Sequence, residues 1–361
     1  MNPEGTYKPT TSDAAMTGFL PPTLAATFTP TGVFHNALAP SLGIHTALSL
    51  GAYGISRLTK RVDIKDWLWP SGLVLNAWYH ALRPAFNSSL SSPISVVLKS
   101  LPWAQQLLLG GVTVWGTRLF YRIVSRSLRR GQDDPRYAKF HGNDAESEGM
   151  WNKALFSIFG MEGLAQSLIA LSWSIPLSNP VGARVTSVTT PSSSAIAEVV
   201  HNLAIALFTS GLALEILADY QLEAHKRKRS PPSNSNELQR SGVWSIVRHP
   251  NYLGDALVHL SFPLLSYASS SLTLFSIIGP LANYLFLRYV GGDKENESDQ
   301  EERYRKGSRG KLEQLQSWRG EKNSFWPGVR EVGNPWTWIV VGLGAVGVGL
   351  EKGLKRISPM P

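Results

Sequence analysis

The chain has 361 residues, a formal net charge of +9 and no cysteine, and its eight histidines include no close pair. These features exclude disulfides, thiolate zinc sites and cysteine nucleophiles, and we expect no metal site. Charged residues collect in a few segments and leave long apolar gaps. The positive charge therefore suits loops that face an anionic membrane leaflet, and we expect a lipid bilayer as partner and no nucleic acid. The oligomeric state stays open.

Apolar stretches that are long enough, or nearly long enough, to cross a membrane recur along the chain. We predict spans over 36–56, 67–87, 103–124, 151–172, 196–219, 255–268, 272–290 and 335–351. The sequence thus predicts an all-α fold, a polytopic transmembrane helical bundle of about seven to eight spans.

The predicted organisation has four parts. They are a loosely ordered N-terminal arm (1–35), N-terminal membrane helices (36–100), a membrane domain (101–310), and a hydrophilic loop with a C-terminal apolar helix (311–361). The whole segment 291–334 is expected to be a long hydrophilic loop. Its acidic run 293–302 is either solvated or folds back over the site as a lid.

Lysine and arginine are unevenly distributed among the predicted loops. Nearly all of them lie in 57–66, 125–150, 220–248 and 291–334, and almost none lie in 88–93 and 173–195. By the positive-inside rule, the first group faces the cytosol. Lys352, Lys355 and Arg356 break this pattern, because they would fall on the opposite side. Either 335–351 re-enters the membrane, or one weak early span does not cross.

The stretch 242–255 brings many polar groups to the edge of an apolar run, where they are costly unless they are paired or used. Arg248 and His249 suit a phosphate or a carboxylate. Asn251 offers both a donor and an acceptor, which suits an amide or a ribose edge. Asp255 is either a ligand contact or an N-terminal cap of the following span.

Pro250 should push His249 out of the helical region and so orient the side chains around it. We therefore interpret 242–255 as the floor of a binding site at the cytosolic mouth of the bundle.

The predicted span before this stretch ends in Glu215, Asp219 and Glu223, which share one helical face. Glu215 lies within the apolar run, so it is either a functional group or one half of a buried ion pair with Arg118 or Arg122. The basic run 225–229 follows, and it is either a membrane anchor or a phosphate-binding element.

Two further patterns carry weaker signals. Arg118 and Arg122, together with Asp133, Arg136 and Tyr137, form a second polar group, in which Arg122 could simply reach the interface. The spacing of the glycines at 342, 344 and 347 matches a dinucleotide-binding pattern, but no strand precedes it. Close packing of helices explains these glycines better.

Several of these residues together resemble the C-terminal domain of the steroid 5-alpha-reductase superfamily, and in particular its uncharacterised DUF1295 branch. The resemblance covers roughly 110–305 and is strongest at 215–255. The residues that carry it are Glu215, Asp219, Tyr220, Gln221, Gly242, Trp244 and the run from Arg248 to Asp255.

The resemblance implies a membrane enzyme of the endoplasmic reticulum that binds NADPH from the cytosolic side and reduces the C=C bond of a hydrophobic enone. By position, it implies cofactor contacts from Glu215, Asp219, Lys226, Asn251, Asp255 and Tyr304. We add Arg118, Gln221, Arg248, His249 and Tyr252 to this expected set. Tyr252 or Tyr220 is the expected proton donor.

Two alternatives stay open. The Arg-His-Pro-x-Tyr motif also resembles membrane methyltransferases that use S-adenosylmethionine, although the acids that should follow it closely occur only from Glu295 onward. A membrane protein that keeps the scaffold without catalysis is the third hypothesis.

Overall fold

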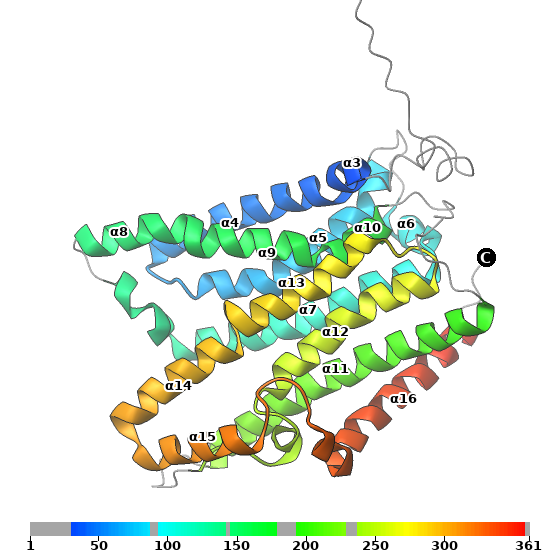
Figure 1. Cartoon of the computed structure of the whole chain (residues 1–361). Coiled ribbons are helices and arrows are strands. Elements are labelled where there is room, and N and C mark those ends of the chain that lie inside the picture. Colours follow the sequence, from blue (N-terminus) through cyan, green and yellow to red (C-terminus); the bar gives the residue numbers. More distant parts are fainter. Residues whose placement is uncertain (1–29, 87–92, 142–144, 179–192, 229–236, 358–361) are drawn as a thin grey trace, which may run out of the picture.

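The computed structural model describes residues 30–86, 93–141, 145–178, 193–228 and 237–357, and every regular element in these ranges is a helix. The long helices run side by side along a common direction (Figure 1). They are α4 (Ala39–Thr59), α5 (Ile64–Phe86), α7 (Trp103–Arg130), α11 (Ser194–Lys228), α12 (Pro250–Ala268), α13 (Ile278–Tyr289) and α16 (Pro335–Ile357).

Shorter helical segments complete the fold. Before α11 these are α3 (Pro30–Val33), η1 (Phe34–Leu38), α6 (Ile94–Ser100), η2 (Pro135–Phe140), α8 (Ala145–Ala154), η3 (Leu155–Gly160), α9 (Met161–Ile169) and α10 (Leu171–Leu177). After α11 they are η4 (Gly242–Ser245), η5 (Leu274–Ile277), α14 (Asp293–Gly307), α15 (Arg309–Glu321) and η6 (Val329–Gly333).

Three helices of the described chain are long and apolar enough to cross a membrane, namely Ser194–Lys228, Leu274–Gly307 and Pro335–Ile357. The pair Glu146–Ile169 and Leu171–Leu177, which bends by 51°, would add a fourth. The all-α prediction is confirmed for these residues, and the fold is compatible with a helical membrane protein. The larger number of seven to eight spans stays a prediction.

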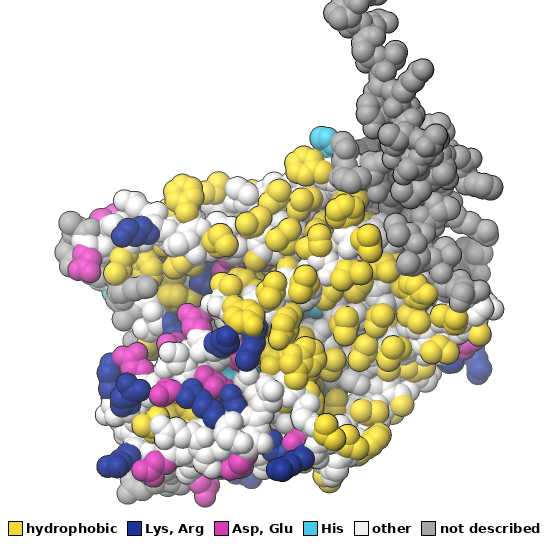
Figure 2. All heavy atoms as spheres, in the orientation of Figure 1, with side chains coloured by type: hydrophobic (Ala, Val, Ile, Leu, Met, Phe, Trp, Pro, Cys, Tyr) yellow, Lys and Arg dark blue, Asp and Glu magenta, His cyan; other side chains and the backbone are white. Residues whose placement is uncertain are grey.

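Apolar and charged side chains separate on the molecular surface. Figure 2 shows a broad hydrophobic region over the long helices, with charged groups gathered at the end that holds α14 and α15. The exposed apolar side chains include Leu203 of α11, Leu285 of α13 and Val346 of α16. Such a large exposed apolar surface suits contact with lipid.

The helices pack around a central core that contains the fully buried side chains of Trp115, Trp173 and Phe262. Helices α11 and α12 approach each other most closely at Gly211 and Gly254. A β-carbon on Gly211 would lie 2.5 Å from the carbonyl oxygen of Gly254, so neither position has room for a side chain. This contact places Glu215, on the next turn of α11, against Gly254 near the start of α12.

The polar segments differ from the prediction. The expected loop 291–334 contains the helices α14 and α15, because its many Glu, Lys and Arg residues are good helix formers. For the same reason α7 extends to Arg130 and α11 to Lys228, so residues 225–228 of the basic run lie on the last turns of α11. A hydropathy pattern identifies the apolar part of a helix that suits lipid. It does not identify the polar residues that extend the same helix at its ends.

Parts of the predicted arm 1–35, the turn 88–93, the loop 173–195 and the basic run 225–229 fall outside the described residues. The described parts of the arm belong to α3 and η1, and those of the loop to α10 and the start of α11.

Candidate functional site

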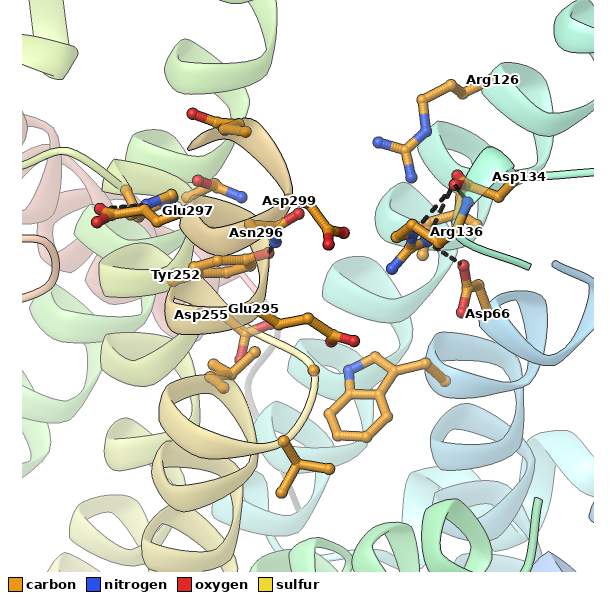
Figure 3. A pocket seen from close by; sticks show the side chains of 18 of the residues that line it. Asp66, Arg126, Asp134, Arg136, Tyr252, Asp255, Glu295, Asn296, Glu297 and Asp299 are labelled. Carbon is orange, nitrogen blue, oxygen red and sulfur yellow. Dashed lines mark hydrogen bonds and ion pairs between the residues drawn. The ribbon is translucent and has the colours of Figure 1, made fainter. Parts of the chain in front are cut away.

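A cavity of about 830 Å³ lies at the charged end of the bundle. Its walls come from helices α5, α7, α9, α11, α12, α13, α14 and α15 and from the short segments η2, η3 and η4. The lining includes the apolar side chains of Trp69, Ile123, Met161 and Phe286. It also includes many charged side chains, some of which Figure 3 labels. Its volume lies in the range of small-molecule and cofactor sites.

Most of the residues predicted to bind a cofactor line this cavity. They are Arg118, Glu215, Asp219, Lys226, Arg248, His249, Asn251, Tyr252 and Asp255. Three predicted residues are not part of its lining. Tyr220 is 70% exposed on the outer side of α11, and Gln221 and Tyr304 also lie outside the lining.

The turn before α12 is fastened to the end of α11. Gly242 has a φ of 71°, in the left-handed region that glycine tolerates. Gln221 accepts a hydrogen bond from the backbone N–H of Val243 at 2.9 Å. Trp244 Nε1 donates to the carbonyl oxygen of Ala218 at 3.1 Å. Gln221 therefore holds the turn against α11.

The residue before Pro250 lies outside the helical region, as was predicted. His249 has φ −129° and ψ 70°, and Pro250 occupies the first turn of α12. Asn251 follows, and its Oδ1 atom is buried with no hydrogen-bond partner among the described residues. A buried acceptor without a partner is costly, so this atom marks a place for a ligand donor.

The suggested cap role of Asp255 is wrong, because α12 begins five residues earlier, at Pro250. Asp255 is buried and accepts a hydrogen bond from Asn283 Nδ2 of α13 at 2.7 Å. Its carboxylate thus links α12 to α13 at the base of the cavity.

Arg248 and His249 already hold a carboxylate, and it belongs to Glu297 of α14. Arg248 Nε and Nη2 donate to the two carboxylate oxygens at 2.8 Å and 3.0 Å. His249 Nε2 lies 3.0 Å from Glu297 Oε1, and Arg319 Nε of α15 donates to Oε2 at 3.0 Å. This network holds the hydrophilic segment against the start of α12, as the fold-back alternative anticipated.

Glu215 is both paired and part of the cavity wall. Arg118 Nη1 donates to Glu215 Oε2 at 2.7 Å, which confirms the predicted ion-pair alternative. Arg118 also binds Asp219, and Arg122 Nε lies 3.4 Å from the same carboxylate. The two helices α7 and α11 are therefore joined by a ladder of ion pairs along the cavity.

Three cations of the lining, Arg126, Lys226 and Arg303, have no ion pair within the described part of the chain, and Arg303 donates instead to the backbone carbonyl of Asp299 on its own helix. Arg126 extends this arginine stripe by one turn of α7, and Lys226 lies near it on the last turn of α11. Arg227, in contrast, lies 3.6 Å from Glu223 and does not contribute to the lining. The free charges of Arg126 and Lys226 make this part of the cavity attractive to an anion.

A second polar cluster lies on the same side of the cavity as Arg126 and was only partly recognised from the sequence (Figure 3). Arg136 Nη2 lies 3.1 Å from Asp66, and its Nε lies 3.1 Å from Asp134. Burial alone would raise the pKa of Asp134, but the hydrogen bond and charge of Arg136 outweigh burial and hold this pKa below its usual value. Burial raises the pKa of the neighbouring Tyr137 phenol.

Helix α14, which was predicted to be part of a loop, adds polar groups to the wall of the cavity. Asn296 Nδ2 donates to the phenol oxygen of Tyr252. The carboxylates of Glu295 and Asp299 point toward the open space opposite Arg136 (Figure 3). Neither has an ion pair among the residues that the structure describes.

The geometry defines a helical protein with an apolar outer surface and a deep polar cavity at one end. The model of a family described as protein of unknown function (DUF1295) matches residues 52–316, so the chain belongs to the DUF1295 family. Comparison with curated proteins and with solved structures finds no match.

Proposed function

We propose that this protein is a multi-pass membrane reductase of the steroid 5-alpha-reductase superfamily, which uses NADPH or NADH to reduce the C=C bond of a hydrophobic enone or lipid-like substrate. The single observation that carries the proposal is a cavity that combines unpaired cations, a buried unpartnered amide oxygen and an apolar wall. We place the protein in the endoplasmic reticulum membrane with seven to eight spans and with the cavity facing the cytosol.

The charged part of the cavity suits a dinucleotide. Arg126 and Lys226 would hold phosphate groups, because cations without an internal partner gain most from a bound anion. Asn251 Oδ1 would accept a hydrogen bond from the carboxamide or a ribose hydroxyl. The bound dinucleotide would supply a hydride, and the protein's contribution would be to orient it.

The apolar part suits the substrate. Trp69 and Phe286 stack with ring centroids 4.5 Å apart and border the cavity beside Ile123 and Met161. A hydrophobic alkene held against this wall would lie next to the charged half, where the cofactor would bind. Positioning the two reactants in this way would supply much of the rate acceleration.

Tyr252 is our proposed proton donor, since addition of a hydride to an enone must be followed by addition of a proton. Its oxygen accepts a hydrogen bond from Asn296, which leaves the phenol hydrogen available to the cavity. Tyr220 is not used in this proposal, because its side chain does not line the cavity.

One observation favours the alternative of a methyltransferase. Glu295 and Asp299 present carboxylates to the cavity, and these suit the positive charges of S-adenosylmethionine. The same cavity would then bind a cation on its α14 side and leave Arg126 and Lys226 without a partner.

A ligand titration separates these hypotheses. Purified protein is heated with NADPH, NADH or S-adenosylmethionine, and the cofactor that binds the folded state raises the unfolding temperature. We expect NADPH or NADH to do so. Stabilisation by S-adenosylmethionine alone would establish the methyltransferase alternative, and stabilisation by none of the three would favour a non-catalytic protein.

Two variants test the assignment of residues. Asn251→Ala should abolish NADPH binding while the unfolding temperature without ligand stays unchanged. Arg126→Gln should weaken binding about tenfold or more, as expected for loss of a charge-assisted hydrogen bond. Arg129→Gln is the matched control on the same helix, because Arg129 is exposed and is not part of the lining. Unchanged NADPH affinity in Asn251→Ala would contradict the proposal.

A further inference from the structure

A second cavity, of about 560 Å³, lies at the opposite end of the bundle. It is formed between the beginning of α11 and the end of α16, which lie beside each other near the C-terminus in Figure 1. Its lining is rich in polar and charged side chains. Their internal pairing decides which of them are available to a ligand.

Both acids of this cavity have partners within the protein. Glu351 Oε1 is the more buried, and it accepts a hydrogen bond from Trp103 Nε1 at 2.5 Å and lies 3.2 Å from His201 Nε2. Glu198 Oε1 forms an ion pair with Lys352 Nζ at 3.2 Å. Lys352 offsets the charge of Glu198, whereas the hydrogen bonds to Glu351 leave its carboxylate charged. Because three Lys and Arg side chains line the cavity against two carboxylates, its net charge is still positive.

Three polar groups of the lining remain available to a ligand. Lys355 and Arg356 line the cavity and have no ion pair among the described residues. Asn202 also lines it, and its Oδ1 atom is buried without a hydrogen-bond partner in the described chain. Basic residues are common in the last turn of a helix, where they offset the helix dipole. That role does not explain why they border a cavity or why a buried amide beside them lacks a partner.

The location indicates what kind of anion would fit. Helices α11 and α16 both qualify as membrane spans. Large apolar side chains flank the cavity on their outer faces, with Val199 66% and Leu203 47% exposed on α11, and Leu354 60% exposed on α16. A ligand with its anionic group in the cavity would thus have apolar surface available for attached acyl chains. Basic pockets between membrane helices are known to hold lipid head groups.

We propose that this cavity binds the phosphate group of an anionic lipid. Lys355 and Arg356 supply the positive charge, and the Asn202 amide contacts the head group. Binding also accounts for the C-terminal cations that break the positive-inside pattern, since a lipid phosphate would neutralise them. The proposal is independent of the function of the first cavity, which lies at the other end of the molecule.

The test uses purified full-length protein in a neutral detergent. The unfolding temperature is measured with phosphatidic acid, with phosphatidylcholine and with inorganic phosphate. We expect a saturable increase of several degrees with phosphatidic acid, and little change with the other two. An equal increase with phosphatidylcholine would overturn the proposal, because it would require only acyl chains. An equal increase with inorganic phosphate would overturn the assignment to a lipid and indicate a site for free phosphate.

Variants test whether the increase in unfolding temperature comes from lipid bound in this cavity. The double variant Lys355→Gln/Arg356→Gln should lose most of the increase, and Asn202→Ala should reduce it. The matched control is Arg227→Gln/Lys228→Gln, which removes two adjacent exposed cations from the end of α11 at the opposite side of the bundle. All variants should unfold at the wild-type temperature without lipid. A full lipid response in Lys355→Gln/Arg356→Gln would refute the site.

Discussion

Arg248 holds Glu297 through two hydrogen bonds, 2.8 Å and 3.0 Å long, although the two residues are 49 positions apart in the chain. Arg248 precedes α12, whereas Glu297 lies on the hydrophilic helix α14. Both side chains are largely shielded from solvent, with 10% and 11% of their surface exposed. Through this pair the most polar part of the chain becomes a wall of the cavity.

Removal of the Glu297 charge should therefore destabilise the protein strongly. Glu297→Gln leaves Arg248, His249 and Arg319 without their shared carboxylate, and uncompensated buried charges cost about 3 kcal/mol. We expect a lower unfolding temperature and faster proteolysis of α14 and α15. Glu302→Gln is the control, since Glu302 is exposed and its ion pair with Lys306 lies on the same helix, where solvent screens it and it contributes little to stability. Equal stability of the two variants would show that the network does not hold the segment in place.

A second prediction concerns the contact of α11 with α12. In Gly254→Ala the new β-carbon would lie 2.5 Å from the carbonyl oxygen of Gly211 and 2.9 Å from Glu215 Cγ, so the helices must separate. Overpacking of this kind costs about 1–3 kcal/mol. Gly349→Ala should instead be neutral or stabilising by up to about 1 kcal/mol, because that helical position has open space around it. Thermal unfolding of both variants measures the difference, and a neutral Gly254→Ala would contradict the close contact.

The glycine pattern of α16 allows a third test. A β-carbon on Gly344 would lie 2.8 Å from the carbonyl oxygen of Ala206 on α11, whereas Gly342 has nothing within 4 Å. Gly344→Val should loosen α16 from α11 and destabilise the protein by about 1–3 kcal/mol. Gly342→Val should change the unfolding temperature little. If both variants leave NADPH affinity unchanged per folded molecule, the pattern has a packing role and does not bind the dinucleotide.

The pH dependence of stability should report on Asp134. Its pKa is lowered in the folded state, so its ion pairs stabilise the fold above the usual pKa of 3.8, and this stabilisation is lost as the pH falls through the lower folded value. Asp134→Asn should cost about 1–2 kcal/mol near neutral pH. The difference in unfolding free energy between this variant and wild type should disappear at acidic pH. The measurement is chemical unfolding in detergent at several pH values.

The control for that experiment is Asp299→Asn, which removes a carboxylate that has no ion pair among the described residues. It should change the unfolding free energy little at any pH. A difference between wild type and Asp134→Asn that persists below the folded pKa would contradict the assignment to charge pairing.

Local patterns in the amino-acid sequence were enough to predict much of this site. The four-residue spacing of Glu215 and Asp219 placed them on one helical face, and Arg118 was a natural partner in a low-dielectric bundle. Pro250 predicted the non-helical backbone at His249. Helical periodicity, proline geometry and the cost of burying charge act over a few residues, so they can be read directly from the chain.

The identity of the more distant partners depended on packing. Many carboxylates could have neutralised Arg248, and only the folding of α14 against α12 selects Glu297. Likewise, Asp66 and Arg136 come from separate segments and meet because α5 and η2 converge beside α7. Any carboxylate can pair with any arginine or lysine, so residue type alone does not identify the partner. The choice among equivalent partners is made by the buried helix contacts that bring one of them within reach.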